Sequence, residues 1–414
     1  MTPGDRYDVI VVGGGAAGMM AAGIAASRQK RVLLIEKNKK LGEKLSITGG
    51  GRCNIWNAEE DERLLLSHFG QSADFLHSTF AAFGMKETEA FFDSIGVPAS
   101  VEAKKRAFPV SRSAPDVTRA LFDFLKASGV DVKTGLPVAR VHTSKGQIES
   151  VLMGGKEYEA DSYIFATGGV SHPETGSTGD GFRWLMDLGH SVAEPTPTIV
   201  PVKVKEAWAR SLAGITIPDM KMAVYVNGAK KLAIKGNVLM THFGMSGPLI
   251  LNNAGRIADL MQEGEVTAAI DTYPAMDLGI LDKHIASIFD QNKNKELQNV
   301  FRQIAPAGTA DALLSLLPNI DRDKRVHSVT KEERRRIAEL LKTLPLTITG
   351  LMGLSRAVVA DGGVSLTEID TKTMRSKVVP NLFIIGDLLN IKRPTGGYSL
   401  QLCWTTGFVA GQNA

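Results

Sequence analysis

The pattern of apolar and polar positions predicts a parallel sheet assembled from both ends of the chain. Short unbroken apolar runs that end in glycine or acidic residues are typical of strands covered on both faces. Four segments have this pattern: residues 9–12, 31–36, 161–169 and 381–387. Helical spacing of apolar positions predicts helices within residues 73–95 and 115–128, between the second and third of these strands.

The segments that follow predict antiparallel strands. Residues 130–159 predict a β-meander with strands at 130–134, 139–143 and 148–153. Residues 199–275 alternate like short antiparallel strands, with a hairpin turn at Asn227 and Gly228. The strands expected in that region are residues 202–204, 220–226, 231–234, 238–241 and 266–271.

Two further features concern the organisation of the chain. Three prolines within residues 193–201 indicate a linker or a crossing between domains. Residues 276–344 have a mostly helical pattern, which is clearest over residues 331–342. After residue 346 the pattern returns to strands and glycine turns.

The first fifty residues hold the most specific motif. The first strand leads into Gly13, Gly15 and Gly18, a G-x-G-x-x-G turn followed by a helix of small residues. Gly13 permits the sharp turn, Gly15 lets the backbone approach a pyrophosphate, and Gly18 lets the helix pack on the sheet. The free N–H groups at the helix N-terminus favour phosphate. Glu36 ends the second strand, where its carboxylate can accept hydrogen bonds from ribose hydroxyls. The motif predicts binding of the ADP half of a dinucleotide.

Composition narrows the class of protein. The 414 residues are 43% hydrophobic and 22% charged, which suits a folded chain of two or three domains. A net charge of +4 does not by itself imply nucleic acid. The cysteines, Cys53 and Cys403, form no C-x-x-C motif, so we expect no redox-active dithiol and a cytoplasmic location. Glycines interrupt the apolar stretch at 9–26, so we expect neither a signal peptide nor a membrane span.

Three segments carry a resemblance to a known family. They are residues 42–54 (GEKLSITGGGRCN), 241–248 (THFGMSGP) and 396–401 (GGYSLQ). In these segments, and in order over essentially the whole chain, the sequence resembles the BaiN/RdsA-like NAD(P)/FAD-dependent oxidoreductases, whose relatives include an aminoacetone oxidase-like branch. The chain departs from the family pattern at Asn237, Asp387, Asn390 and Ser399.

The resemblance implies an α/β fold with a Rossmann-like two-dinucleotide-binding domain that holds FAD without a covalent bond. Because nucleotide-type motifs occur at both ends of the chain, we expect this domain to be split between residues 1–194 and 345–414. A β-barrel-like domain at 195–275 and a helical domain at 276–344 would then be inserted. Family activities include enoyl-type steroid reduction, amine oxidation and dihydrouridine formation in ribosomal RNA.

The residues expected to contact FAD include a second glycine loop at 48–54 and the start of the last helix. In this fold class an acidic residue at the position of Asp387 bonds the ribityl chain, and the helix after Gly397 directs N–H groups at the flavin. The full set is Gly13, Gly15, Ala16, Ala17, Gly18, Glu36, Lys37, Lys44, Thr48, Gly49, Gly50, Gly51, Arg52, Cys53, Asn54, Ala166, Thr167, Gly168, Gly169, Gly386, Asp387, Gly396, Gly397, Tyr398, Ser399 and Leu400.

Candidate catalytic residues are His242 and Tyr398, as proton donors or as groups that orient the substrate. Each could equally have a structural role, His242 at a domain interface and Tyr398 in packing. Cys53 could lie beside the flavin or be a buried structural thiol. No spacing of metal ligands is present, so we expect no metal site.

The expected reaction is hydride transfer from reduced FAD to an unsaturated C=C or C=N bond, with NAD(P)H as the electron donor. The alternatives are an amine oxidase that uses oxygen, reduction of uridine in ribosomal RNA, and a flavin-binding module without turnover. Basic clusters at 104–106, near Arg112, and at 322–325 with 334–336 are either solvated faces or an RNA-contacting surface. The partner is therefore a small-molecule substrate or ribosomal RNA; the oligomeric state stays open.

Overall fold

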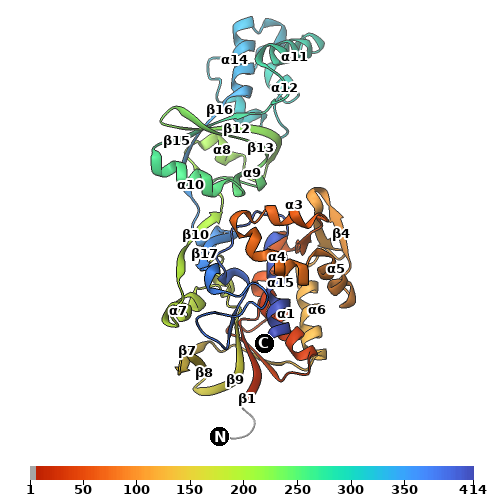
Figure 1. Ribbon diagram of the computed structural model, residues 1–414. Coiled ribbons are helices and arrows are strands. Elements are labelled where there is room, and N and C mark those ends of the chain that lie inside the picture. Colours follow the sequence, from red (N-terminus) through yellow and green to blue (C-terminus); the bar gives the residue numbers. More distant parts are fainter. Residues whose placement is uncertain (1–5) are drawn as a thin grey trace. The chain divides into compact units, whose positions relative to one another are not determined.

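The structure, a computed structural model, describes residues 6–414. It forms two compact units (Figure 1). The terminal unit contains both chain ends, up to Thr196 and from Ala360 onward, and the inserted unit is Pro197–Val359. Strands β10 (Val192–Ile199) and β17 (Val359–Val364), which pair as a two-stranded sheet, contain the two points where the chain passes between the units.

The terminal unit is built on a sheet of order β6-β2-β1-β9-β8-β7, with β18 also paired to β9. The parallel strands are β1 (Arg6–Val12), β2 (Val32–Glu36), β6 (Asp131–Thr134), β9 (Lys156–Phe165) and β18 (Leu382–Ile384). Val9, Ile10 and Val11 are fully buried. Burial on both faces explains why this strand is an unbroken apolar run.

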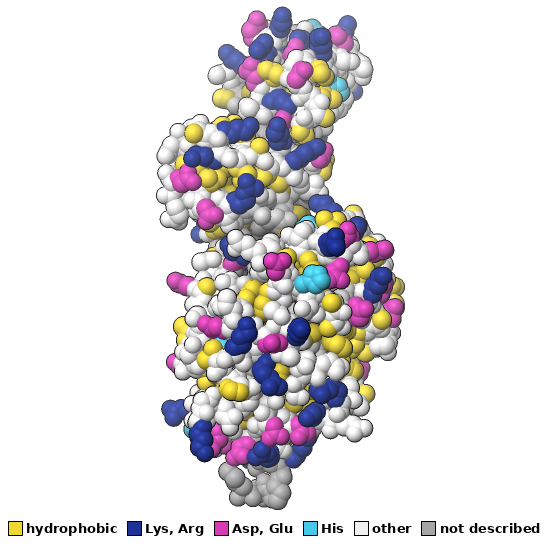
Figure 2. Space-filling view, in the orientation of Figure 1, with side chains coloured by type: hydrophobic (Ala, Val, Ile, Leu, Met, Phe, Trp, Pro, Cys, Tyr) yellow, Lys and Arg dark blue, Asp and Glu magenta, His cyan; other side chains and the backbone are white. Residues whose placement is uncertain are grey.

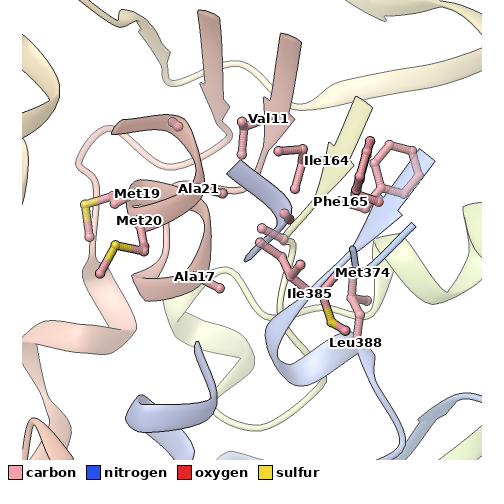
Figure 3. Packing of buried hydrophobic residues seen from close by; sticks show 14 of the residues in the cluster. Val11, Ala17, Met19, Met20, Ala21, Ile164, Phe165, Met374, Ile385 and Leu388 are labelled. Atoms are coloured by element: carbon pink, nitrogen blue, oxygen red, sulfur yellow. The ribbon is translucent and has the colours of Figure 1, made fainter. Parts of the chain in front are cut away.

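Two helices from opposite ends of the chain lie side by side. Helix α1 (Ala16–Ser27) contacts α15 (Tyr398–Asn413), in which a Cβ on Gly407 would lie 2.6 Å from the carbonyl oxygen of Ala17. A Cβ on Gly411 would lie 2.6 Å from the carbonyl oxygen of Ala21. The two glycines, one helical turn apart, therefore allow the backbones to approach closely. Figure 3 shows α1 residues in one cluster with side chains of β1, β9 and the segment after β18.

The remaining elements of the terminal unit surround this sheet. A three-stranded sheet is formed by β3 (Trp56–Asn57), β5 (Arg106–Pro109) and β4 (Ala99–Glu102). The helices are α2 (Glu43–Ser46), α3 (Glu62–Ser67), α4 (Ala73–Ala82), α5 (Met85–Ser94), α6 (Ala114–Ala127) and α7 (Asp180–Asp187). The antiparallel strands of the main sheet are β7 (Val138–Ser144) and β8 (Gln147–Met153).

One pairing differs from the sequence prediction. We expected residues 130–134 to begin the β-meander, but β6 pairs in parallel with β2, with Val132 opposite Leu34. Helix α6 precedes β6, so the connection is a helical crossover of the kind that joins parallel strands. The meander is formed by β7, β8 and β9.

The inserted unit contains a closed barrel of order β11-β14-β13-β12-β15-β16. Its strands are β11 (Val202–Val204), β12 (Thr216–Val226), β13 (Ala229–Thr241), β14 (Gly244–Ser246), β15 (Val266–Asp271) and β16 (Leu344–Leu351). Its helices are α8 (Ala207–Ser211), α9 (Pro248–Leu251), α10 (Ala254–Glu263), α11 (Leu278–Gln291), α12 (Leu297–Phe301), α13 (Ala310–Leu314) and α14 (Lys331–Lys342).

Two sequence expectations are corrected in this unit. Residues 231–234 and 238–241 form one strand, β13, because an irregular register opposite Ile217 and Met220 lets the strand continue through Gly236. We also expected residues 345–359 to return to the FAD-binding domain, but β16 pairs with β11 and β15 and completes the barrel. The return occurs at Ala360. The barrel and the helices share one hydrophobic core, so a separate helical domain stays a prediction.

No helix among residues 6–414 is long and apolar enough to cross a membrane. The fold class predicted from the sequence, a Rossmann-like domain with inserted barrel and helices, is confirmed.

A buried hydrogen-bond chain stabilises the segment between β17 and β18. The His190 side chain has no exposed surface; its Nδ1 lies 2.8 Å from Glu368 Oε2 and its Nε2 lies 2.9 Å from Ser376 Oγ. Ser376 Oγ also accepts from the N–H groups of Val378 and Val379. The hydroxyl must therefore donate to Nε2, which leaves Nδ1–H to donate to Glu368. Burial alone would raise the pKa of Glu368, but hydrogen bonds from Ser191 and His190 hold it below its usual value.

We expect His190→Ala to destabilise the terminal unit by about 2–4 kcal/mol, because it leaves a carboxylate and a buried hydroxyl without their partner. Thermal unfolding followed by calorimetry would measure the change. His77→Ala, at an exposed position of the same unit, is the control and should leave the transition unchanged. Equal transitions for the two variants would contradict this interpretation.

Candidate functional site

The candidate site lies where the parallel strands of the terminal unit end. Gly13 follows β1, Glu36 ends β2, Ala166 follows β9 and Gly386 lies just beyond β18. These strand ends are adjacent: Gly13 N–H donates to the carbonyl of Ile35, and Ala166 N–H donates to the carbonyl of Val12. Ligands of open parallel sheets bind outside the carboxyl ends of the strands. The structure therefore brings together four segments that the sequence analysis had assigned separately.

The three motif glycines occupy different environments. Gly13 has a φ of +110°, and a Cβ there would lie 2.4 Å from the carbonyl oxygen of Ala166. A Cβ on Gly18 would lie 1.9 Å from the carbonyl oxygen of Gly13. A Cβ on Gly15 would meet no atom within 4 Å. Two of the glycines thus pack the turn against the sheet, and the third keeps space open beside the backbone.

Glu36 is held by backbone N–H groups on both sides. Its Oε2 accepts from Gly14 N–H at 2.7 Å, and its Oε1 accepts from Asn38 N–H at 2.8 Å. The neighbouring Lys37 pairs with Asp180 at 2.7 Å and also donates to Thr178. Lys37 therefore joins the end of β2 to the N-terminus of α7, in addition to its predicted role at the cofactor.

The segment after β9 carries an unpaired polar atom. Thr167 Oγ1 is buried and has no hydrogen-bond partner within the described residues. Gly168 has a φ of +75°, and Gly169 lies against Asp387, whose backbone oxygen would be 3.4 Å from a Cβ there. Ala166, Thr167, Gly168 and Gly169 thus pass directly beside the turn that follows β18.

The loop at 48–54 is a compact glycine turn. Gly49, Gly50 and Gly51 all have positive φ, and a Cβ on Gly50 or Gly51 would meet no atom within 4 Å. Thr48 closes the loop, because its carbonyl accepts from Cys53 N–H at 3.0 Å. Arg52 pairs with Glu102 at 3.4 Å and lies 4.3 Å from the Phe108 ring centroid. The outer side of the loop is open to a ligand.

Cys53 is a fully buried thiol. Burial raises its pKa to about 12, against an opposing hydrogen bond to Thr48. The thiol therefore keeps its proton at neutral pH and is not a nucleophile. Of the two roles left open for Cys53, these observations favour the structural one.

The glycine pair before α15 is fastened to the loop at 48–54. In the amide orientation that satisfies its neighbours, Asn54 accepts from Gly397 N–H at 2.9 Å and donates to the carbonyl of Trp56 at 3.1 Å. Asn57 Nδ2 donates to the carbonyl of Gly396 at 2.9 Å. A Cβ on Gly397 would lie 2.3 Å from the Trp56 backbone carbon. The start of α15 is thus fixed directly against β3.

Asp387 is the centre of an ion-pair network that joins several predicted site residues. Lys44 Nζ lies 3.3 Å from Asp387 Oδ2 and donates to Ser171 Oγ at 2.6 Å. Arg393 donates from Nη2 to Asp387 Oδ1. Burial alone would raise the pKa of Asp387, but the charges of Arg393 and Lys44 outweigh it and the pKa lies below its usual value. The carboxylate is therefore ionised at neutral pH.

Arg393 and Ser171 are the residues of this network that sequence reasoning missed. Arg393 also donates from Nε to Ser399 Oγ at 3.1 Å, so Ser399 belongs to the network. Leu400 follows it in the first turn of α15 and is partly buried. No sequence motif marks Arg393, which lies in the irregular segment between β18 and α15.

The two candidate catalytic residues lie in different units. Tyr398 is buried in the terminal unit, with ring centroids of His68 and Phe69 at 4.9 and 5.9 Å. Burial raises the pKa of Tyr398, and the negative charge of Glu59 acts in the same direction. His242 is exposed in the inserted unit, in the turn between β13 and β14, with its ring edge-on to Phe243. Their roles stay predictions.

The basic clusters are partly neutralised by carboxylates. Lys105 pairs with Glu59 at 2.7 Å, and Arg112 pairs with Glu102 at 3.1 Å. Arg334 of the second cluster pairs with Asp282 at 2.8 Å. Figure 2 shows Lys and Arg interspersed with Asp and Glu over the face in view. These observations favour the interpretation as solvated faces.

Two observations test whether the strand-end site fits a dinucleotide such as FAD. The space beside Gly15, Gly50 and Gly51 is open, and it is space that a Cβ would fill. The N-cap residue of helix α1 is Gly15, which has no side chain to cap the helix, and Thr167 Oγ1 lacks a partner within residues 6–414. Open backbone beside a helix N-terminus is what a pyrophosphate requires. The residues present fit the cofactor.

These features define a Rossmann-type dinucleotide-binding protein. The family model described as HI0933-like protein Rossmann domain matches residues 7–413, so the chain belongs to that family. This is the BaiN/RdsA-like flavoprotein family that the sequence resembles, and the protein is an FAD-dependent oxidoreductase of that family.

Two curated relatives are similar over almost their whole length. The 3-dehydro-bile acid delta(4,6)-reductase of Clostridium scindens is 29% identical over 399 residues, which cover 94% of this chain and 95% of the relative. The ribosomal RNA dihydrouridine synthase of Escherichia coli is 26% identical over 415 residues, which cover 99% and 98%. Among solved structures, the open conformation of a flavocytochrome c3 fumarate reductase matches all of this chain and 78% of its own at 15% identity. Its TM-score of 0.55 indicates a shared fold.

Proposed function

We propose that the protein reduces an unsaturated C=C or C=N bond of a small organic substrate, with NAD(P)H as the source of electrons. The observation that carries this proposal is the strand-end site. Its open glycine backbone and its two fixed carboxylates, Glu36 bonded to a backbone N–H and Asp387 paired with Lys44, fit FAD. The names of the two curated relatives support the reaction type, because a delta(4,6)-reductase and a dihydrouridine synthase both add hydrogen across a double bond.

The chain's own residues would bind and orient FAD, and the bound cofactor supplies the hydride chemistry. Glu36 would accept from the ribose hydroxyls, and the N-terminus of α1 would face the pyrophosphate. Asp387 would hold the ribityl chain, and Lys44 would fix one oxygen of the Asp387 carboxylate. The N–H groups at the start of α15 would favour negative charge on the flavin.

Tyr398 or His242 would supply the proton that accompanies the hydride, and each is considered by itself. The Tyr398 phenol carries a proton at neutral pH, as a donor must, while burial raises its pKa and makes it a weaker acid. His242 is exposed, which a group that meets a substrate requires.

An anaerobic absorbance titration tests the proposal. Purified protein should show the flavin absorption band, and NADPH or NADH should bleach it before an unsaturated substrate restores it. Enones, in which a C=C bond is conjugated to a ketone, are the first acceptors to test. Heat-released flavin at the same concentration is the control for direct reduction by the nicotinamide.

Each other result identifies a different function. Bleaching by small amines, with peroxide released once oxygen is readmitted, would replace the reductase with an oxidase. Flavin that neither nicotinamides nor amines reduce would indicate a binding module, and protein that takes up no flavin would overturn the proposal. A second candidate acceptor is uridine in ribosomal RNA, favoured by the relative of that name that matches almost the whole chain. It is tested by adding RNA fragments to the reduced enzyme.

A further inference from the structure

Arg393 is a buried cation, and each of its three side-chain nitrogens donates a hydrogen bond. The residue is 6% exposed. Its Nη2 donates to Asp387 Oδ1, its Nη1 donates to the carbonyl of Ile391 at 2.6 Å, and its Nε donates to Ser399 Oγ at 3.1 Å. Burying a guanidinium costs free energy unless it is paired and hydrogen-bonded. The chain thus provides an acceptor for each of the three nitrogens of this side chain.

The network around Arg393 carries an excess of positive charge. Asp387 is the carboxylate to which both Arg393 and Lys44 pair, and the described ion pairs give neither cation another acidic partner. Lys44 Nζ otherwise donates to Ser171, a neutral hydroxyl. The nearby Cys403 is neutral, because burial raises its pKa to about 12. The two cations, Arg393 and Lys44, and the Asp387 carboxylate together carry a net charge of about +1, in a partly buried part of the site.

The position of this charge connects two parts of the site. Asp387 lies in the turn after β18, and Ser399 lies in the first turn of α15. Arg393 bonds both, so one guanidinium joins the residue expected at the ribityl chain to the helix expected at the flavin. A rigid link between these two places would fix the geometry of both.

We propose that Arg393 is a positioning residue that orients Asp387 and Ser399 and makes the site electropositive, so that the protein favours reduced over oxidised FAD. Reduced flavin carries a negative charge on its pyrimidine edge at neutral pH, and fixed positive charge nearby stabilises it. This inference rests on the proposed function only in requiring that FAD binds at the strand ends. It assigns a role in setting the reduction potential that no sequence motif marks.

The test measures the flavin midpoint potential of the holoenzyme by equilibrium with a redox dye, together with the FAD dissociation constant. Arg393→Met should lower the midpoint potential, which corresponds to a loss of about tenfold in the preference for reduced FAD. Arg393→Lys keeps the charge and should recover most of that preference. Lys392→Met is the matched control, because Lys392 immediately precedes Arg393 and its side chain is 80% exposed.

Lys44→Met provides a second removal of charge if Arg393→Met does not fold. It should move the midpoint potential in the same direction, because it also removes one of the two cations. A merely structural role predicts a lower unfolding temperature with an unchanged potential, and that result would overturn the inference. Absence of FAD from the wild-type protein would overturn the proposed function instead, so the two failures are distinguishable.

Discussion

Gly18→Ala is expected to disrupt the terminal unit, whereas Gly15→Ala is expected to keep the fold and lose tight binding of FAD. A Cβ on Gly18 would lie 1.9 Å from the carbonyl oxygen of Gly13 and 3.2 Å from the Cβ of Ala166, so it has little room to relax. Overpacking against backbone should cost more than about 3 kcal/mol. A Cβ on Gly15 meets no atom within 4 Å, and its φ of −82° suits alanine.

The contrast follows from what occupies the space beside each glycine. Protein atoms fill it at Gly18, so the substitution acts on folding. At Gly15 the space is free of protein atoms, so an added methyl group interferes only with a ligand that approaches the backbone. We expect the affinity of Gly15→Ala for FAD to fall by at least about 100-fold, or about 2.7 kcal/mol.

Calorimetry of the apoproteins and fluorescence titration with FAD would separate these effects. Gly353→Ala is the matched control, since that glycine also has open space around it and an ordinary φ of −75°. It should change neither quantity. A Gly15→Ala protein that binds FAD as tightly as the wild type would show that the pyrophosphate does not approach this turn.

The sequence predicts the parts of the site whose geometry is local. A strand, a glycine turn and a helix follow one another within residues 9–26, so their arrangement depends on backbone sterics and short hydrogen bonds. The same holds for the hairpin turn, where Asn227 and Gly228 both have the positive φ that such a turn requires. Helix α14 begins and ends where its pattern predicts, with Thr330 and Glu333 forming a capping box.

Pairings between distant segments could not be predicted in the same way. Residues 130–134 have the pattern of a strand, but that pattern does not say whether the neighbour is β2 or β7. The same ambiguity applies to β16, whose apolar positions suit a barrel as well as a parallel sheet. In both cases the choice of partner is a property of tertiary packing.

Within the site, Arg393 shows a similar limit of prediction from sequence. An arginine in an irregular segment ordinarily lies on the surface, and nothing in its neighbours indicates burial. In the sequence, Ser399 is a departure from the pattern of the family that the chain resembles. In the structure its hydroxyl accepts from Arg393, so the significance of the serine depends on a residue six positions earlier.

Glu36→Ala is expected to abolish stable FAD binding. Each oxygen of the Glu36 carboxylate accepts one backbone N–H, from Gly14 at 2.7 Å and from Asn38 at 2.8 Å, which fixes the side chain at the end of β2. A carboxylate oxygen has a second lone pair, and these remain for the two ribose hydroxyls. Removing the group would lose these bonds and leave two N–H groups without acceptors, so the protein should purify without flavin.

The ratio of flavin to protein in the purified sample and the dissociation constant of added FAD measure the effect. Glu36→Gln keeps one acceptor oxygen but turns an amide toward an N–H group, so it should weaken binding by about tenfold or more. Glu89→Ala, at an exposed position of α5, is the control and should retain full flavin content. A Glu36→Ala protein that purifies with full flavin content would place the ribose away from the end of β2. The acceptor for its hydroxyls would then have to be sought on another strand of the sheet.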